Sequence, residues 1–554
     1  MRSCFFPLLV FLFSGQAQAQ YLPDTTQQKI DKLFQRWDSE TSPGCAVGII
    51  RNDSLIFSKG YGLANLEYSA PNTPATIFHV ASVSKQFTGY AIVLLARQGR
   101  LRLDDDVRQY LPWFPDLGET ITIRHLLNHT SGIRDQWQLL ATAGTRLDDV
   151  ITQEQIIKVL SRQRALNSKP GERYNYCNSG YTMLAEIVKA VSGKTLRQFT
   201  DSAIFKPLKM NSTHFHDDYT EIVKGRSYSY QRKNGNQFAN SVLSYSNTGA
   251  TSLFTTVEDL SKWIMNFYDP KAGDAQDIVQ LTEKGRLNSG KVIDYALGIG
   301  NFTYKGWRGF VHNGADAGYR TTLLVCPDLK LGCVVLANVG DFNPGARAEE
   351  LMALFVEEKE AATKKNAARP DSSQAILGNP ASMQRFEGSY ISDEGTQMAF
   401  RVTDNKFYAD AFGRSELLKG DGGTFSALAN PVQQYAFTAK PGDTTVLVTF
   451  GPGETALLQK YSAPPATERE LKAYEGTYYC PELDCNYGIA LKNKQLVLTS
   501  NKYTDMPLRF AGPDHLHSNY WWMSHLRVLR NAKKEIEGFE VNDGRVLHLR
   551  FNKL

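Results

Sequence analysis

Two side chains three positions apart, Ser82 and Lys85, form the only Ser-x-x-Lys sequence in the chain. The apolar pattern that follows, up to Gly99, predicts a helix that begins near Ser82 and has a glycine at its C-terminal end. Residues three apart share a helix face, so the lysine amine is expected beside the serine hydroxyl. A serine needs such a partner to attack an acyl carbon, and the helix N-terminus adds N–H groups for an oxyanion. A chance occurrence is the alternative.

A tyrosine and an asparagine two positions apart, Tyr176 and Asn178, come after a Pro-Gly turn signal. The apolar helical run behind them ends at Gly193. A phenol can relay a proton and an amide can hold a substrate carbonyl, so this pair suits a catalytic cleft. The rival pair, Tyr245 and Asn247, lies in a polar stretch with no helix behind it. The sequence context therefore favours Tyr176 and Asn178 over this second pair.

A histidine, His312, precedes Gly314 by two positions in a strand-like run over residues 309–325. Residues 332–338 are its expected hairpin partner. Glycine inside a strand indicates a close approach of the backbone to something else, here a substrate. A lone histidine is more often a packed or surface residue, and the neighbouring glycine is what makes this one a candidate.

In order along the chain, the three motifs resemble the signature of the penicillin-recognising serine hydrolases: Ser82-x-x-Lys85, Tyr176-x-Asn178 and His312-x-Gly314. More narrowly, they are similar to the branch that contains class C β-lactamases, D-aminopeptidases and esterases. The resemblance covers about residues 24–356 and includes the phrase from Arg124 to Gly132. It implies an α+β fold with a β-lactamase/transpeptidase-like domain, in which helices flank an antiparallel sheet.

The resemblance also implies a role for each motif residue. Ser82 is the expected acyl-accepting nucleophile, and Lys85 and Tyr176 are expected to handle its proton, with the choice of base between them left open. Asn178 is expected to help hold the substrate amide. The backbone N–H groups of Ser82 and Ala315 are the expected oxyanion hole.

His312, also assigned to the catalytic set, stands where β-lactamases carry the lysine of a Lys-Thr-Gly motif. It lies next to the cleft-lining Gly314. Histidine is largely neutral at neutral pH, whereas lysine is a cation that anchors a carboxylate. The departure favours amides, esters or peptides recognised by an amine or by shape over substrates held by a free carboxylate. Cys177 and Lys209 also depart from the family pattern, and neither touches a proposed catalytic group.

Other features argue against a metal site, a different hydrolase fold or a nucleic-acid partner. The histidine pairs at 125/129 and 214/216 lack a third ligand signal and are interpreted as structural. The chain has no Gly-x-Ser-x-Gly nucleophile elbow. A net charge of +5 and a pI of about 8.6 are mild for this length.

The first 19 residues have the pattern of a secretory signal peptide, with a positive start, an apolar run from Cys4 to Phe13 and an A-x-A cleavage site. The run is too short to span a bilayer, so no membrane anchor is expected. We therefore expect a secreted or periplasmic protein.

An oxidising compartment permits disulfides. The predicted pairs are Cys480 with Cys485, in a small closed loop, and Cys326 with Cys333, across a hairpin turn. Small unpaired core cysteines are the alternative.

The C-terminal third contains a short repeat: Phe386-Glu-Gly-Ser-Tyr390 matches Tyr474-Glu-Gly-Thr-Tyr478, 88 residues later. Short alternating runs follow each copy, which predicts two small antiparallel, lipocalin-like β-barrels. The predicted domains are a signal peptide at 1–19, a hydrolase domain at 20–360, a linker at 361–380, and barrels at 381–463 and 464–554.

This layout resembles that of the D-aminopeptidases, in which a loop from the last barrel enters the catalytic cleft. The resemblance implies residues 511–520 as the candidate loop here. An ordinary barrel loop is the alternative, and the barrels could instead bind cell-wall glycan or drive oligomerisation.

Together these features predict an exported serine hydrolase that works through an acyl-enzyme on Ser82, without metal or cofactor. Its expected substrate is a small peptide, amide or ester, most specifically one suited to a D-amino-acid-directed aminopeptidase or amidase. A class C-like esterase or β-lactamase is one alternative, and a penicillin-binding receptor or pseudoenzyme is another. The oligomeric state stays open, with a homodimer as one option.

Overall fold

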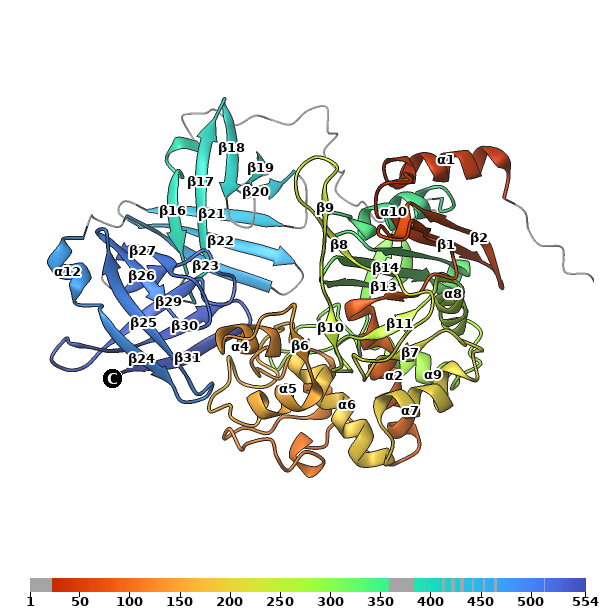
Figure 1. The fold of residues 1–554 in the computed structure, drawn as a ribbon, viewed down its shortest axis with the longest axis horizontal. Helices are drawn as coiled ribbons and strands as arrows, with labels where there is room; N and C mark the ends of the chain where they lie inside the picture. Colours follow the sequence, from red (N-terminus) through yellow and green to blue (C-terminus); the bar gives the residue numbers. More distant parts are fainter. Residues whose placement is uncertain are drawn as a thin grey trace, which may run out of the picture.

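The computed structural model of the chain describes residues 22–357 and 383–554, except for 393, 411–413, 420–423, 429–432, 441–442, 452–453, 463–465 and 513. The described residues form an α+β domain followed by two closed antiparallel barrels (Figure 1). The predicted fold class is therefore confirmed. The predicted signal peptide and linker lie outside the described residues.

A six-stranded antiparallel sheet forms the centre of the α+β domain. In spatial order its strands are β12 (Gly300–Tyr304), β13 (Trp307–Asp316), β14 (Tyr319–Cys326), β15 (Leu331–Ala337), β1 (Cys45–Arg51) and β2 (Ser54–Tyr61). Alternate residues of β1 face opposite layers, so Ala46 and Ile50 enter one core cluster while Val47 and Ile49 enter the other.

Helices cover both faces of this sheet, which explains why β15 reads as an unbroken apolar run. One face packs against α1 (Asp24–Phe34) and α10 (Pro344–Ala353). The other packs against α8 (Val257–Asn266), behind which lies α2 (Ser84–Arg97). Every residue of α2 from Ser84 to Leu95 is buried, so this helix runs through the core. Its Gly89 allows a close approach, because a Cβ there would lie 2.0 Å from the carbonyl oxygen of Leu297.

Shorter elements complete the domain. The helices are α3 (Ile123–Leu127), α4 (Gln136–Thr142), α5 (Gln153–Leu160), α6 (Asn178–Ser192), α7 (Leu196–Thr200) and α9 (Ala275–Leu281). The small strands are β3 (Leu63–Asn65), β4 (Ala70–Pro71), β5 (Phe78–His79), β6 (Val150–Ile151), β7 (His214–Phe215), β8 (Tyr230–Arg232), β9 (Phe238–Asn240), β10 (Ser244–Tyr245) and β11 (Leu253–Thr255). As predicted, α6 ends at Gly193, whose φ is +72°. No helix within the described ranges is long and apolar enough to cross a bilayer.

Each barrel closes from eight consecutive antiparallel strands. The first contains β16 (Gly388–Ile391), β17 (Gln397–Thr403), β18 (Lys406–Asp410), β19 (Arg414–Lys419), β20 (Thr424–Ala427), β21 (Gln434–Lys440), β22 (Asp443–Gly451) and β23 (Glu454–Tyr461). The second follows α12 (Glu468–Lys472) and contains β24 (Gly476–Cys480), β25 (Cys485–Lys492), β26 (Gln495–Thr499), β27 (Met506–Gly512), β28 (His515–His517), β29 (His525–Arg530), β30 (Ile536–Asp543) and β31 (Val546–Lys553).

The five-residue repeat marks the same structural position in both barrels. In the first, the buried Tyr390 donates its hydroxyl to the carbonyl oxygen of Phe386 at 3.0 Å. In the second, Tyr478 does the same to Tyr474 at 2.6 Å. The repeat therefore fixes the entry of the first strand into each barrel core.

All six described cysteines are free thiols, so neither predicted disulfide is present. The register of β14 with β15 pairs Cys326 with Leu331 and Cys333 with Leu324, which sets the two cysteines diagonally rather than opposite each other. Both pack into the core between the sheet and α10. Cys480 and Cys485 do lie directly opposite across β24 and β25, and they remain reduced in the structure.

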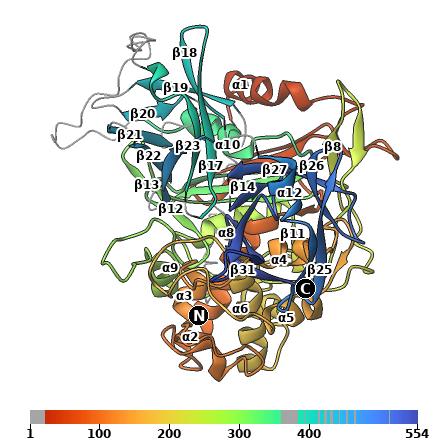
Figure 2. The same cartoon turned by 90° about the vertical axis from the view of Figure 1, so that its left-hand side faces the viewer.

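The second barrel docks next to α4, which Figure 2 views from the barrel side. Arg134, just before α4, is fully buried at this contact. Its guanidinium donates to the carboxylate of Glu482 at 2.6 Å and to the carbonyl oxygens of Leu547 and His548, each at 2.9 Å. Removing one partner of a buried ion pair leaves a charge without compensation, so a substitution on either side of this contact is expected to be strongly destabilising.

A substitution at Arg134 tests this contact. We expect Arg134→Met to lower the free energy of unfolding by about 3–5 kcal/mol, because Glu482 then keeps an unpaired buried charge. The matched control is Arg162→Ala, whose partner Asp484 lies in the same turn but is exposed and 3.7 Å away. The control should change the free energy by no more than about 0.5 kcal/mol. Urea unfolding of the full chain measures both, and equal losses would contradict the assignment.

Candidate active site

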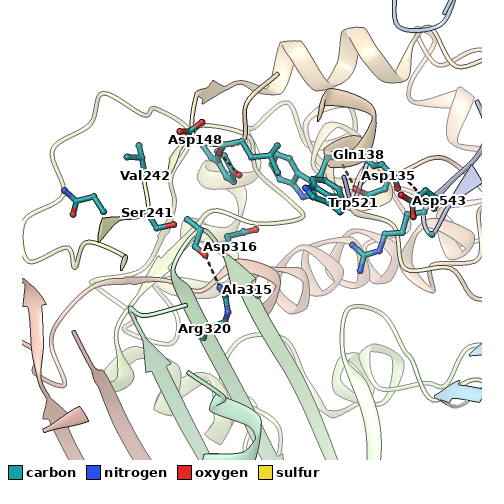
Figure 3. Close-up of a pocket in the computed structure, with 17 residues that line it drawn as sticks. Asp135, Gln138, Asp148, Ser241, Val242, Ala315, Asp316, Arg320, Trp521 and Asp543 are labelled. Carbon is teal, nitrogen blue, oxygen red and sulfur yellow. Dashed lines mark hydrogen bonds between the residues drawn. The ribbon is translucent and has the colours of Figure 1, made fainter. Parts of the chain in front are cut away.

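Ser82 faces a cavity of about 380 Å³ between the α+β domain and the second barrel. An adjoining cavity of about 770 Å³ shares part of its lining: Trp137, Ala315, Asp316, Arg320 and Arg545. Figure 3 shows the larger cavity, with Asp148, Ser241 and Val242 on one side, Asp135, Gln138, Trp521 and Asp543 on the other, and Ala315, Asp316 and Arg320 at the strand ends. The two cavities form one cleft with the serine near one end.

The serine is presented by a short 3₁₀ turn, Ala81–Val83, that runs into α2. Ala81 has a left-handed backbone, with φ +48°, a conformation that costs a non-glycine residue about 1–2 kcal/mol. The strain is maintained by close packing from β13, because a Cβ on Gly314 would lie 2.3 Å from the carbonyl oxygen of Val80 and 3.1 Å from the Ala81 Cβ. Gly314 is thus required for strand β13 to reach the turn, which brings Ala315 into the Ser82 cavity.

Lys85 lies one turn along from the serine and is fully buried. Its amine donates to the Ser82 hydroxyl at 3.0 Å, to the Asn178 side-chain oxygen at 2.9 Å and to the carbonyl oxygen of Ala250 at 2.8 Å. Burial lowers the pKa of Lys85 from its ordinary value to about 7, although the carboxylate of Asp316 acts in the opposite direction. A large share of this amine is therefore unprotonated near neutral pH and able to accept the serine proton.

Tyr176 completes the group around the serine. Its ring lies 4.9 Å from the Lys85 amine, and the residue lines the same cavity as Ser82. Burial raises the pKa of Tyr176, against the smaller lowering effects of the Ser82 contact and Arg545. The phenol therefore stays protonated and suits a proton donor. His129 fixes the tyrosine from behind, because its ring packs 4.2 Å from the Tyr176 ring while its Nδ1 accepts from the Cys177 backbone N–H at 3.0 Å.

Asn178 lies in the cavity lining, but both ends of its amide are already bound. The oxygen accepts from Lys85, and the nitrogen donates to the carboxylate of Asp135 at 2.8 Å. The same carboxylate oxygen accepts from the Asn178 backbone N–H at 2.7 Å. In the structure this asparagine orients the lysine amine, in addition to any contact with substrate. Sequence reasoning missed Asp135, whose local signal was that of an N-cap for α4.

His312 does not line the Ser82 cavity. Its Nδ1 faces the Asn313 carbonyl oxygen at 2.7 Å and must donate, so its Nε2 accepts from the Tyr295 hydroxyl at 2.8 Å. Burial lowers the pKa of His312 to about 3, which keeps it neutral. The structure thus places this predicted catalytic residue as a support for Tyr295, with both ring nitrogens occupied.

The histidines interpreted as structural differ in their surroundings: His125 has a hydrogen-bond partner, whereas neither ring nitrogen of His216 has one in the described part of the chain. Nδ1 of His125 accepts from the Thr122 backbone N–H at 3.2 Å and caps α3. His214 and His216 lie with Glu221 at distances that would suit a metal ion. Both oxygens of Glu221 already accept from the Arg197 guanidinium, at 2.6 and 2.8 Å, which favours an ion pair over a metal ligand set.

The candidate loop at 511–520 does not line the cleft. Its described residues belong mostly to β27 and β28, and His517 bonds instead to Gln397 of the first barrel. The second barrel reaches the cleft with Trp521 and with the turn between β30 and β31, which contributes Asp543, Gly544 and Arg545. A signal for that turn was present, since Asp-Gly between alternating runs is a strong hairpin pattern.

Comparison with known proteins finds relatives of the α+β domain. Residues 30–357 match the Beta-lactamase family. Among curated relatives, Protein flp of Staphylococcus aureus (strain N315) is 29% identical over 360 residues, which is 62% of this chain and 69% of that protein.

Two solved structures share the fold at lower identity. The octameric penicillin-binding protein homologue from Pyrococcus abyssi has a TM-score of 0.54 and 23% identity, and the match covers 79% of this chain and 99% of that one. The D-amino acid amidase from Ochrobactrum anthropi SV3 has a TM-score of 0.50 and 19% identity, and the match covers 60% of this chain and 96% of that one.

The buried amine predicts the pH dependence of the site. We expect kcat/KM for p-nitrophenyl acetate to rise about tenfold per pH unit below pH 7 and to level off above it, because only the neutral amine of Lys85 accepts a proton. Lys85→Arg, which stays protonated, should lose at least about a hundredfold. Initial rates between pH 5 and 9 check this. A flat profile for the native protein would contradict the role of Lys85 as base.

Proposed function

The chain belongs to the beta-lactamase family of serine hydrolases, and from this premise we propose that it is an exported hydrolase that forms an acyl-enzyme on Ser82. The observation that carries the proposal is the contact of 3.0 Å between the Lys85 amine and the Ser82 hydroxyl. A buried lysine with a pKa of about 7 has no evident use in packing. It has a direct use in proton transfer.

The proposed reaction proceeds in two halves. Neutral Lys85 takes the proton of Ser82 as Oγ bonds to the acyl carbon, and the backbone N–H groups of Ser82 and Ala315 hold the resulting oxyanion. The Tyr176 hydroxyl gives its proton to the leaving group as the scissile bond breaks, and is reprotonated from Lys85. Water then attacks the acyl-enzyme, its proton passes to Lys85, and Ser82 leaves with that proton. General base and acid steps of this kind contribute about 10²–10⁴-fold each.

We further propose that the bond cleaved is an amide, and that the enzyme is a D-amino-acid-directed aminopeptidase or amidase. Its fold is shared with the D-amino acid amidase of Ochrobactrum anthropi, whose name states that activity. The lining of the larger cavity also supports recognition of a substrate ammonium, since it includes the carboxylates of Asp148, Asp316 and Asp543. Burial raises the pKa of Asp543 to about 6, so it is mostly ionised at neutral pH.

Three chromogenic substrates test the proposal: D-alanine p-nitroanilide, p-nitrophenyl acetate and nitrocefin. We expect multiple turnovers of D-alanine p-nitroanilide by the purified protein, and loss of at least about 10³-fold in Ser82→Ala because the nucleophile is gone. The matched control is Ser241→Ala, which removes another serine of the cleft and should keep most of the activity.

The other outcomes are equally informative. Turnover of p-nitrophenyl acetate or nitrocefin alone would make the protein an esterase or a β-lactamase. A single labelling of Ser82 by a fluorescent penicillin, with no turnover of any substrate, would favour a penicillin-binding receptor and contradict the enzyme proposal.

A further inference from the structure

Arg545 reaches the cleft from the far end of the chain, in the turn that joins β30 to β31. Its backbone is fastened to the α+β domain, because its carbonyl oxygen accepts from the Asp135 backbone N–H at 3.2 Å and from the Asn167 side-chain nitrogen at 2.8 Å. Asn167 also accepts from the Leu547 backbone N–H at 2.8 Å. The turn therefore has a defined position relative to Ser82, although more than 400 residues separate them in sequence.

These docking contacts involve the backbone of Arg545 and not its side chain. The guanidinium carbon of Arg545 lies 4.9 Å from the centre of the Tyr176 ring, and the residue lines the cavity that contains Ser82. Within the described part of the chain, no carboxylate forms an ion pair with this guanidinium. Arg134, at the same contact between the α+β domain and the second barrel, shows the opposite arrangement, since Glu482 neutralises it.

The other charged groups around Arg545 have partners of their own. The carboxylate of Asp135 accepts from Asn178 and from the Trp137 backbone N–H, and that of Asp316 lies 3.0 Å from His79. His312, at the position where relatives with a Lys-Thr-Gly motif carry a cation, is neutral and bonded to Tyr295. Arg320 lines the same cavity, but its guanidinium donates to the carbonyl oxygens of Ala317 and Tyr319. The positive charge of Arg545 acts to lower the pKa of both Lys85 and Tyr176.

We propose that Arg545 is the anion anchor of this active site: its guanidinium binds a carboxylate of the substrate close to the bond that Ser82 attacks. A guanidinium that lies over an aromatic ring can present its fork of N–H donors to a carboxylate in a bidentate manner. Through Arg545, the second barrel then supplies the positive charge that β13, with its neutral His312, lacks. The inference rests on the proposed function and narrows its substrate to short peptides and amides whose leaving group carries a carboxylate.

The neutral His312, taken alone, leads us to expect that substrates held by a free carboxylate are disfavoured. An anion anchor at Arg545 reverses that expectation. With aspartates in the larger cavity and Arg545 beside Ser82, the cleft is bipolar. A short peptide with a free amine and a free carboxylate matches that distribution of charge.

A matched pair of peptides isolates the contact. We expect Arg545→Gln to lower kcat/KM for D-alanyl-glycine by about 10–100-fold, mainly through KM, and for D-alanyl-glycine amide by less than about threefold. Arg545→Lys should fall between the native protein and Arg545→Gln. The control is Arg550→Gln, an exposed arginine on the same hairpin whose partners are Glu537 and Asn552. It should leave both rates unchanged.

Binding to Ser82→Ala, measured by calorimetry, provides a readout that does not depend on turnover. The dipeptide should bind more tightly than its amide, and the added substitution Arg545→Gln should remove that preference. Equal affinities for acid and amide, or equal losses for both with Arg545→Gln, would overturn the anchor.

The failure of the anchor and the failure of the proposed function are distinguishable. If neither peptide is cleaved but p-nitrophenyl esters are hydrolysed in a Ser82-dependent way, the aminopeptidase proposal fails. The charge comparison is then made between 3-carboxyphenyl acetate and its methyl ester, because the carboxylate then lies on the leaving group, as it does in D-alanyl-glycine. Loss confined to the 3-carboxyphenyl ester in Arg545→Gln supports the anchor, and equal loss on both esters contradicts it.

Discussion

The burial of one amine is the constraint on which the rest of the site depends. Lys85 has no contact with solvent, and three oxygens surround its nitrogen: the Ser82 hydroxyl, the Asn178 amide and the Ala250 carbonyl. Because none of these oxygens carries a full charge, desolvation outweighs the distant carboxylates and keeps the pKa of the amine near 7. A carboxylate at the position of Asn178 would hold the amine in its protonated form and remove its value as a base.

The catalytic domain and the second barrel meet at the residues that support this amine. Arg134 enters the buried ion pair with Glu482, and the next residue, Asp135, binds Asn178 with its carboxylate and Arg545 with its backbone N–H. The barrel is therefore part of the cleft rather than an appendage. Two adjacent residues thus serve both purposes: Arg134 and Asp135 dock the barrel, and Asp135 also orients Asn178, the partner of Lys85.

Much of this arrangement follows from local sequence. The Ser-x-x-Lys spacing and the helix ending at Gly193 both depend on neighbours a few positions away, which is why they could be predicted. The five-residue repeat and the alternating runs that follow it predicted two barrels, and in the structure Tyr390 and Tyr478 make the same short-range hydrogen bond.

The parts that could not be predicted depend on contacts between distant segments. Strand register and domain docking set the hydrogen bond from Tyr295 to His312 and the diagonal offset of Cys326 and Cys333. They also set the position of Arg545 in the lining of the Ser82 cavity. Residues 511–520 follow the alternative of an ordinary barrel segment, because polar residues there belong to a bulged strand pair against the first barrel, which spacing alone does not reveal.

The central claim is that Lys85 is the base of the site, and its ionisation can be observed directly. We would record ¹³C NMR spectra of the protein labelled at lysine side chains between pH 5 and 11, with Lys85→Met to assign the signal. The account predicts one lysine that titrates near pH 7. A Lys85 signal that titrates near the ordinary lysine value of about 10.4 would contradict it.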